Sequence, residues 1–207
     1  MLRIIAFTSM AIDHIGLIFF PQFIIFRIIG RLAMPLFAFN IAQGYVRTRS
    51  VPKYGQRILL LALVSQPIYY FLFNNNALNI CFTLLFGLIA IYIYDRAPGY
   101  FLKVLGVLFL SFLAFFLNLE YGAYGVLLIL SFYIFRNSVW MIVVQSILVF
   151  SFILVNFGSI FSIFAIPAFF LAYYFKKYDF RINRALQYFF YPAHLLLIYL
   201  LSLILGQ

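Results

Sequence analysis

The sequence predicts an all-α fold, a polytopic bundle of about nine transmembrane helices forming one integral-membrane domain over residues 1–207. Three observations predict it. Hydrophobic residues make up 67% of the chain and charged residues 9%, whereas about a quarter of the residues of a soluble domain are charged. Apolar runs close to bilayer length recur along the whole sequence. Basic residues collect between alternate runs, a pattern typical of topology signals.

The apolar runs predict nine spans, since a helix needs about 20 apolar residues to cross the hydrocarbon region. The first run contains Asp13 and His14 and lacks a small-residue cleavage site, so we expect a first span and not a signal peptide. Several runs are short, which leaves tilted or re-entrant helices open. The predicted spans lie near 2–20, 23–45, 57–73, 78–95, 101–118, 121–136, 139–156, 159–175 and 187–206.

The basic residues predict the orientation of these spans. The loops at 74–76, 118–120 and 156–159 contain no Lys or Arg. This alternation predicts a cytoplasmic N-terminus, an outer C-terminus and a multi-pass protein of the inner (cytoplasmic) membrane. The alternate loops, predicted to be cytoplasmic, hold Arg3, Arg47, Arg49, Lys53, Arg57, Arg96, Lys103, Arg136, Lys176, Lys177, Arg181 and Arg184.

Other function classes lack their signatures. The net charge of +10 comes from the loops and not from one soluble face, so we expect no nucleic-acid partner. Cys81 is the one cysteine, which rules out an internal disulfide and predicts a structural thiol. The two His residues lie in different spans, so no metal site is expected. The sequence has no phosphate-binding glycine loop, so nothing in it indicates an ATP-driven pump.

Asp13 and His14 lie inside the first predicted span, with His14 roughly 18 Å beyond its cytoplasmic start. Ionisable residues at membrane depth are costly and often mark function. Adjacent helical residues point about 100° apart, so this pair does not share one face. A histidine beside a carboxylate can act as a general base near neutral pH. The alternative is a polar pair that anchors the helix end.

Arg27 and Arg31 lie four residues apart, on one face of the second span and in its outer part. They break the positive-inside pattern, so they either snorkel to the outer surface or pair inside the protein. We expect both within about 6 Å of an acid or of His14, because opposite charges at that range support each other. A buried pair of arginines also suits a carboxylate, phosphate or oxyanion.

Glu120 opens the sixth span, and His194 lies in the cytoplasmic third of the last one. Glu120 is expected either to interact with the helix N-terminus or to partner the arginines. His194 is either an interhelical structural residue or part of a substrate site. Both are therefore candidate substrate-binding residues.

Five blocks of sequence resemble the TraX family, in order along nearly the whole chain. They read IDHIG at 12–16, FRIIGRLAMPLFAF at 26–39, NICFTL at 79–84, EYGAYGV at 120–126 and YPAHL at 191–195. TraX proteins are named for acetylation of pilin in conjugative pili, and the family resembles integral-membrane acyltransferases. The resemblance implies an enzyme that moves an acetyl group from cytoplasmic acetyl-CoA to an outer amine or hydroxyl.

By resemblance, His14 matches the catalytic histidine, assisted by Asp13, and Arg27 and Arg31 match the arginine positions. The acceptor implied is the pilin N-terminus or another cell-surface molecule. Acyl transfer needs a base and oxyanion donors, and these residue types suit both roles. Acetyl-CoA is anionic, so basic residues of the inner loops are candidates for its phosphates. They are Arg47 and Arg49, with Lys53, Arg57, Arg181 and Arg184 beside them.

Two other functions remain open at this stage. A proton- or ion-coupled transporter would use Asp13, His14 and Glu120 as relay groups, although no inverted repeat supports it. A non-catalytic component of secretion or pilus assembly would need no buried polar pocket. The acyltransferase hypothesis makes a geometric prediction: His14 and the two arginines line one cavity, which a pantetheine arm reaches from the cytoplasm.

Overall fold

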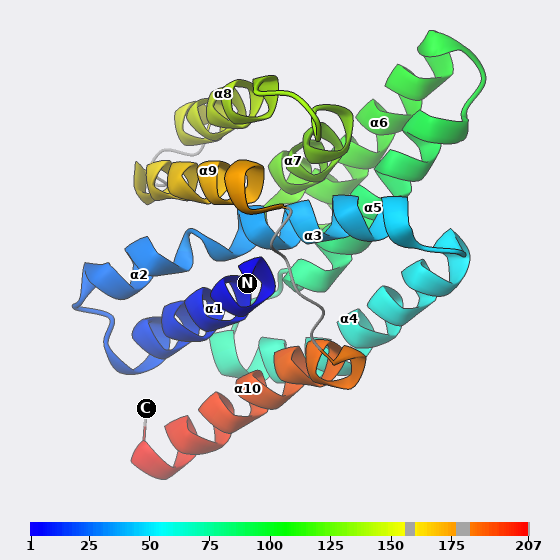
Figure 1. The fold of residues 1–207 in the computed structure, drawn as a ribbon. Coiled ribbons are helices and arrows are strands. Elements are labelled where there is room, and N and C mark those ends of the chain that lie inside the picture. Colours follow the sequence, from blue (N-terminus) through cyan, green and yellow to red (C-terminus); the bar gives the residue numbers. More distant parts are fainter. Residues whose placement is uncertain (156–159, 177–182, 207) are drawn as a thin grey trace.

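A computed structural model describes residues 1–155, 160–176 and 183–206, and within them every regular element is a helix. The all-α prediction is confirmed. In chain order the elements are α1 (Leu2–Phe19), α2 (Ile24–Gly30), α3 (Ala33–Arg47), α4 (Val51–Phe73), α5 (Ile80–Arg96), α6 (Gly99–Phe116), α7 (Gly122–Ile134), α8 (Trp140–Val155), a 3-10 helix (Ile160–Ala165), α9 (Ile166–Phe175) and α10 (Arg184–Leu205) (Figure 1).

Helical segments coincide with all nine predicted spans, but only some have full bilayer length. Three shorter apolar segments are Gly122–Ile134, Trp140–Val155 and Ile160–Phe175. The predicted outer loop at 156–159, and Lys177 and Arg181 of the basic loop, lie outside the described residues. The number of crossings and the side of each terminus stay predictions. Within the described ranges, five segments are long and apolar enough to span: Leu2–Phe19, Ile24–Arg47, Val51–Phe73, Gly99–Phe116 and Ala185–Leu205.

We expected the second predicted span to be one continuous helix, but the structure divides it into two. It is interrupted at Arg31 and Leu32, between α2 and α3. Pro35 lies four residues after Arg31 and has no backbone N–H to donate to the Arg31 carbonyl. Its ring also clashes with that carbonyl in a regular helix. The interruption is therefore encoded by a proline in the first turn of α3.

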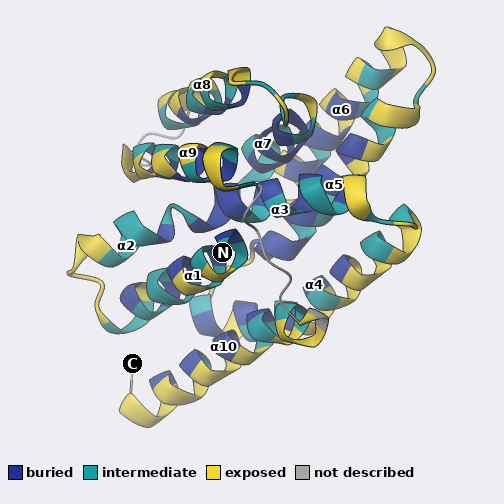
Figure 2. Cartoon of the chain, viewed as in Figure 1, coloured by how far each residue is buried: buried dark blue, intermediate teal, exposed yellow. Residues whose placement is uncertain are grey.

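The helices differ in how far their residues are buried (Figure 2). α3 and α7 are largely buried, and α3 packs against α1, α5, α7 and α9. α6 is the opposite case, with Phe101, Phe112 and Phe115 all more than 60% exposed. Such an apolar outer face is what a lipid-facing helix presents. The burial pattern fits a bundle with its core at α3 and α7 and its outer helices against lipid.

α1 lies between α2 and α10 in the bundle and contacts both (Figure 1). Two glycines allow the close approach of α1 and α2. A Cβ atom at Gly30 would overlap the Asp13 side chain, and one at Gly16 would overlap Phe26. Small residues at such crossings let helix backbones approach closely in membranes. This packing brings the polar residues of α1 against those of α2.

Candidate functional site

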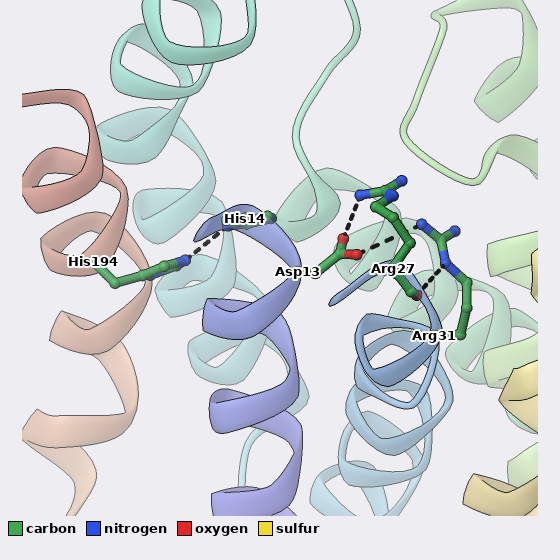
Figure 3. A network of polar contacts seen from close by, with 5 residues as sticks. All are labelled: Asp13, His14, Arg27, Arg31 and His194. Carbon is green, nitrogen blue, oxygen red and sulfur yellow. Dashed lines mark hydrogen bonds and ion pairs between the residues drawn. The ribbon is translucent and has the colours of Figure 1, made fainter. Parts of the chain in front are cut away.

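The two histidines meet between α1 and α10 (Figure 3). Nδ1 of His14 lies 3.0 Å from Nε2 of His194, and the rings are nearly parallel. Both side chains are buried, with 9% of each residue exposed. Phe73 of α4 packs edge-on against His14, and Phe190 stacks on His194. Residues 180 positions apart in sequence thus form one buried pair.

Hydrogen bonding assigns the protons of this pair. Nδ1 of His194 lies 2.8 Å from the Phe190 carbonyl oxygen, which can only accept, so this nitrogen carries hydrogen. In the neutral ring, Nε2 of His194 then has a lone pair and accepts from Nδ1–H of His14. Nε2 of His14 is left as an unprotonated nitrogen. The arrangement holds His14 in the tautomer that a general base needs.

The arginines pair with Asp13 on the other side of α1 (Figure 3). Nη1 of Arg27 donates to Oδ2 of Asp13 at 2.8 Å, and Nη2 of Arg31 lies 3.8 Å from Oδ1. Nε of Arg31 also donates to the Arg27 carbonyl at 3.3 Å. Both arginines are only partly exposed, so they pair inward and do not snorkel. The prediction that they lie near an acid is confirmed.

Asp13 and His14 therefore serve two separate clusters, as expected for adjacent helical residues. Asp13 points toward α2, and His14 points toward α10 (Figure 3). The prediction that His14 and both arginines line one cavity is wrong in this structure, because α1 lies between the clusters.

Glu120 lies in the loop between α6 and α7, which is tied to the loop before α5. The N–H of Glu120 donates to the Leu78 carbonyl at 2.8 Å, and the hydroxyl of Thr83 donates to the Glu120 carbonyl. Burial, and then the Asp13 carboxylate, raise the pKa of Glu120 to about 7, while Arg31 opposes this shift. Glu120 is thus an acid near the arginine cluster, as its predicted role of partner to the arginines requires.

A cavity of about 990 Å³ opens at one end of the bundle. Its mouth is cationic and holds Arg47 and Arg49, the two predicted cofactor-binding residues. Its inner end is apolar and includes Ile80 and Cys81 of α5. The side chain of Arg184 and all of Arg181 lie outside the described part of the chain. The cations lining the cavity are Arg3, Arg47, Arg49, Lys53 and Arg57.

The cavity ends one helical turn from the histidine pair. Met10 lines it and precedes His14 by four residues of α1; Tyr191 lines it and precedes His194 by three residues of α10. One turn of helix rises about 5.4 Å. The predicted route from the basic end toward His14 is therefore present, although the histidines do not line it.

Sequence reasoning missed two polar residues of this cavity, Asn40 and Tyr191. Oδ1 of Asn40 and the hydroxyl of Tyr191 are buried without a hydrogen-bond partner. Tyr191 is 4% exposed, and its ring contacts His194. Tyr191 belongs to the YPAHL block, which was the available signal. Buried polar atoms are normally paired, so these two atoms are available to a molecule that enters the cavity.

The described residues bring together no group of three His, Cys, Asp or Glu side chains suited to a metal ion. Cys81 is buried and lines the inner end of the cavity. Its position among Ile80, Leu84 and Tyr191 is that of a small apolar side chain.

Comparison with known proteins agrees with the resemblance in the sequence. A protein from Dichelobacter nodosus described as "Probable fimbrial assembly protein FimC, serogroup H1" is 29% identical over 142 residues, which cover 61% of this chain and 57% of that protein. An uncharacterized protein of Rickettsia prowazekii (strain Madrid E) is 34% identical over 98 residues, 47% of this chain and 38% of that protein. The chain thus spans less than two thirds of each relative.

No solved structure matches the chain. The family described as "TraX protein" matches residues 1–202, which include the histidine pair, the arginine cluster and the cavity. This match covers nearly the whole sequence, and the chain belongs to the TraX family.

Proposed function

We propose that this protein is a membrane acetyltransferase that takes an acetyl group from cytoplasmic acetyl-CoA and passes it to an amine or hydroxyl at the outer side. One observation carries the proposal. A cavity with a cationic mouth runs to within one turn of a buried histidine whose tautomer suits a base. The link between the TraX family and pilin acetylation supports it.

The donor is proposed to enter at the cationic end. Acetyl-CoA carries several phosphate charges at one end and a thioester at the other, joined by the pantetheine arm. Arg47, Arg49 and Arg57 line the mouth and suit the phosphates, because a guanidinium binds phosphate through two parallel N–H donors. The mostly apolar walls farther in suit the arm. The thioester then lies at the inner end, near Met10 and Tyr191.

His14 is proposed as the general base. The acceptor's lone pair attacks the thioester carbonyl carbon as its proton passes to Nε2 of His14. The C–S bond then breaks, and the proton passes from His14 to the leaving thiolate, giving free CoA and the acetylated acceptor. No net oxidation occurs, and the histidine returns to its starting state. His194 keeps His14 in the required tautomer through the 3.0 Å contact.

The arginine cluster is proposed to serve the acceptor side. Arg27 and Arg31 pair with Asp13 on the face of α1 away from His14, so they suit an anionic group of the acceptor better than the thioester oxygen. The acceptor is proposed to be a pilin N-terminus or another cell-surface amine or hydroxyl. This assignment replaces the oxyanion role that the sequence suggested for the arginines.

Labelled acetyl-CoA tests this proposal. Membranes containing the protein are incubated with it, and the labelled product is identified by mass spectrometry. Wild-type membranes should transfer label, and membranes with His14→Ala should not. Phe112→Ala, on the exposed face of α6, is the matched control and should behave as wild type. Absence of transfer to any protein, lipid or glycan by wild-type membranes would refute the acetyltransferase.

The fimbrial relative favours one second function, a non-catalytic part in fimbrial assembly. That function predicts that fimbriae depend on the presence of the chain and not on its histidines. Deleting the gene and restoring it as wild type or as His14→Ala separates the two. Full restoration of fimbriae by His14→Ala would favour the assembly function.

A further inference from the structure

We propose that the Tyr191 hydroxyl and the N-terminus of α5 together form the site that binds the acyl carbonyl oxygen of the donor. This inference rests on the proposed function and deepens it. It names the group that stabilises the oxyanion, which the arginines, on the other face of α1, are poorly placed to do.

The Tyr191 hydroxyl is buried and has no partner in the described part of the chain. A buried hydroxyl without a partner is destabilising, so such a group is rarely left unpaired. Its residue lines the inner end of the cavity, and its ring centroid lies 5.5 Å from that of His194. The hydroxyl therefore lies in the layer where the thioester should lie, next to His194, the partner of the proposed base.

The N-terminus of α5 faces the inner end of the cavity, which Tyr191 also lines. The helix starts at Ile80, and the N–H of Ile80 approaches the Tyr191 oxygen without meeting hydrogen-bond geometry. Asn79 caps the helix by accepting from the N–H of Cys81, so the Ile80 N–H is not taken by the cap. Ile80 and Cys81 both line the cavity. A helix N-terminus carries a partial positive charge and open N–H donors, which suit a developing oxyanion.

The chemistry follows from these two donors. When the acceptor attacks the thioester carbon, the carbonyl π electrons move onto oxygen and form an alkoxide. The Tyr191 O–H and the Ile80 N–H donate to that oxygen until the C–S bond breaks and the carbonyl re-forms. Both donors are held by helices before the reaction, which is the condition for strong oxyanion stabilisation.

Glu120 opposes this site when it is ionised. Its carboxyl also approaches the Ile80 N–H, and its charge interacts with Tyr191. A second negative charge there is tolerated when Glu120 holds its proton or when Arg31 balances it.

Two non-reacting donor analogues test the proposal by binding alone. Acetonyl-CoA has a ketone in place of the thioester and keeps the carbonyl, whereas S-ethyl-CoA has no carbonyl. Binding of each to purified protein is measured by calorimetry for wild type, Tyr191→Phe and Tyr188→Phe. Tyr188 also lines the cavity, but its hydroxyl accepts from Nε of Arg57 at the mouth, so it is the matched control.

Tyr191→Phe should weaken acetonyl-CoA about 5- to 10-fold and leave S-ethyl-CoA unchanged, because one hydrogen bond to the carbonyl is lost. Tyr188→Phe should affect both analogues equally. Tyr191→Phe should also lower kcat for transfer by about 10²-fold or more with little change in KM. An equal effect of Tyr191→Phe on both analogues would overturn this inference alone. Failure of wild type to bind either analogue would overturn the proposed function with it.

Discussion

Nδ1 of His14 lies 3.0 Å from Nε2 of His194, and the other nitrogen of His194 is held by the Phe190 carbonyl. This series of hydrogen bonds, from the Phe190 carbonyl through His194 to His14, fixes which ring nitrogen carries each proton. It leaves Nε2 of His14 unprotonated in the neutral pair. Two helices from opposite ends of the sequence are needed to produce this single basic nitrogen.

His14→Ala should abolish detectable acetyl transfer while the protein still inserts and folds. Removing a general base costs about 10²–10⁴ in rate, and removing one polar residue does not hinder membrane insertion. Transfer is measured with labelled acetyl-CoA, and folding by gel filtration in detergent. Thr8→Ala, at an exposed position of α1, is the control. Near-normal transfer by folded His14→Ala would exclude His14 as the base.

His194 should act by positioning His14, so His194→Ala should cost less activity than His14→Ala. His194→Gln should recover part of the loss, because a Gln amide oxygen can accept from Nδ1–H of His14. The measurement is kcat over a range of pH, since losing the hydrogen-bond partner also changes the pH at which His14 loses its proton. Identical rates and pH profiles for His194→Ala and His194→Gln would argue against a positioning role for His194.

Arg31→Lys should lose activity, whereas Arg27→Lys should keep more of it. Arg31 donates through Nε to a carbonyl while Nη2 faces Asp13, and a single ammonium cannot reproduce that planar fork. Arg27 has one recorded contact with Asp13, at 2.8 Å, which an ammonium can approximate. Transfer rates of the two variants are compared at equal amounts of folded protein. Full activity of both variants would mean that the positive charge alone matters.

Glu120 should make stability fall as pH rises from about 5 to 8. Its pKa is about 7 in the folded protein, above the ordinary value of 4.5, so the folded state holds the proton more tightly than the unfolded state does. The stabilisation is complete below about pH 4.5 and is lost as pH rises through about 7. Melting temperatures of wild type and Glu120→Gln are compared across this range. Parallel curves would show that Glu120 has an ordinary pKa.

The C-terminus should lie outside and the N-terminus in the cytoplasm. The motivation is that the Lys and Arg residues concentrate in alternate loops. Reporter fusions to each end, and accessibility of a cysteine introduced at exposed Asn75, measure it. Cys81 is buried and does not interfere. A cytoplasmic C-terminus would mean that one predicted span does not cross.

Much of the fold was predictable because hydrophobic length is a local property. Each apolar run is helical where the structure describes it, and most bounds lie within a few residues of those expected, although α4 begins at Val51 and not near 57. The interruption at Arg31 was missed, although Pro35 encoded it, because hydropathy alone does not register a missing N–H donor. The short α7 and α8, which fall below bilayer length, agree with the short runs seen in the sequence.

The candidate site was predictable in its residue types and not in its partners. Charges at membrane depth identified Asp13, His14 and Arg31 from sequence, because burying them needs a reason. Which of them meet depends on crossings between helices far apart in the chain, and the contact of His14 with His194 is one of these. Tyr191 was missed, although it belongs to the YPAHL block, because tyrosine is ordinary in membranes and its unpaired hydroxyl is visible only in the structure.

Gly30 has a consequence for the history of the family. A methyl group there would occupy the space of the Asp13 carboxylate, so the two positions cannot vary independently. Relatives that keep aspartate at position 13 should keep glycine at position 30. Relatives with alanine at position 30 should carry a residue smaller than aspartate at position 13. They would then lose the acid with which the arginines pair. An alignment of TraX sequences would show the two columns changing together, with the arginine columns following.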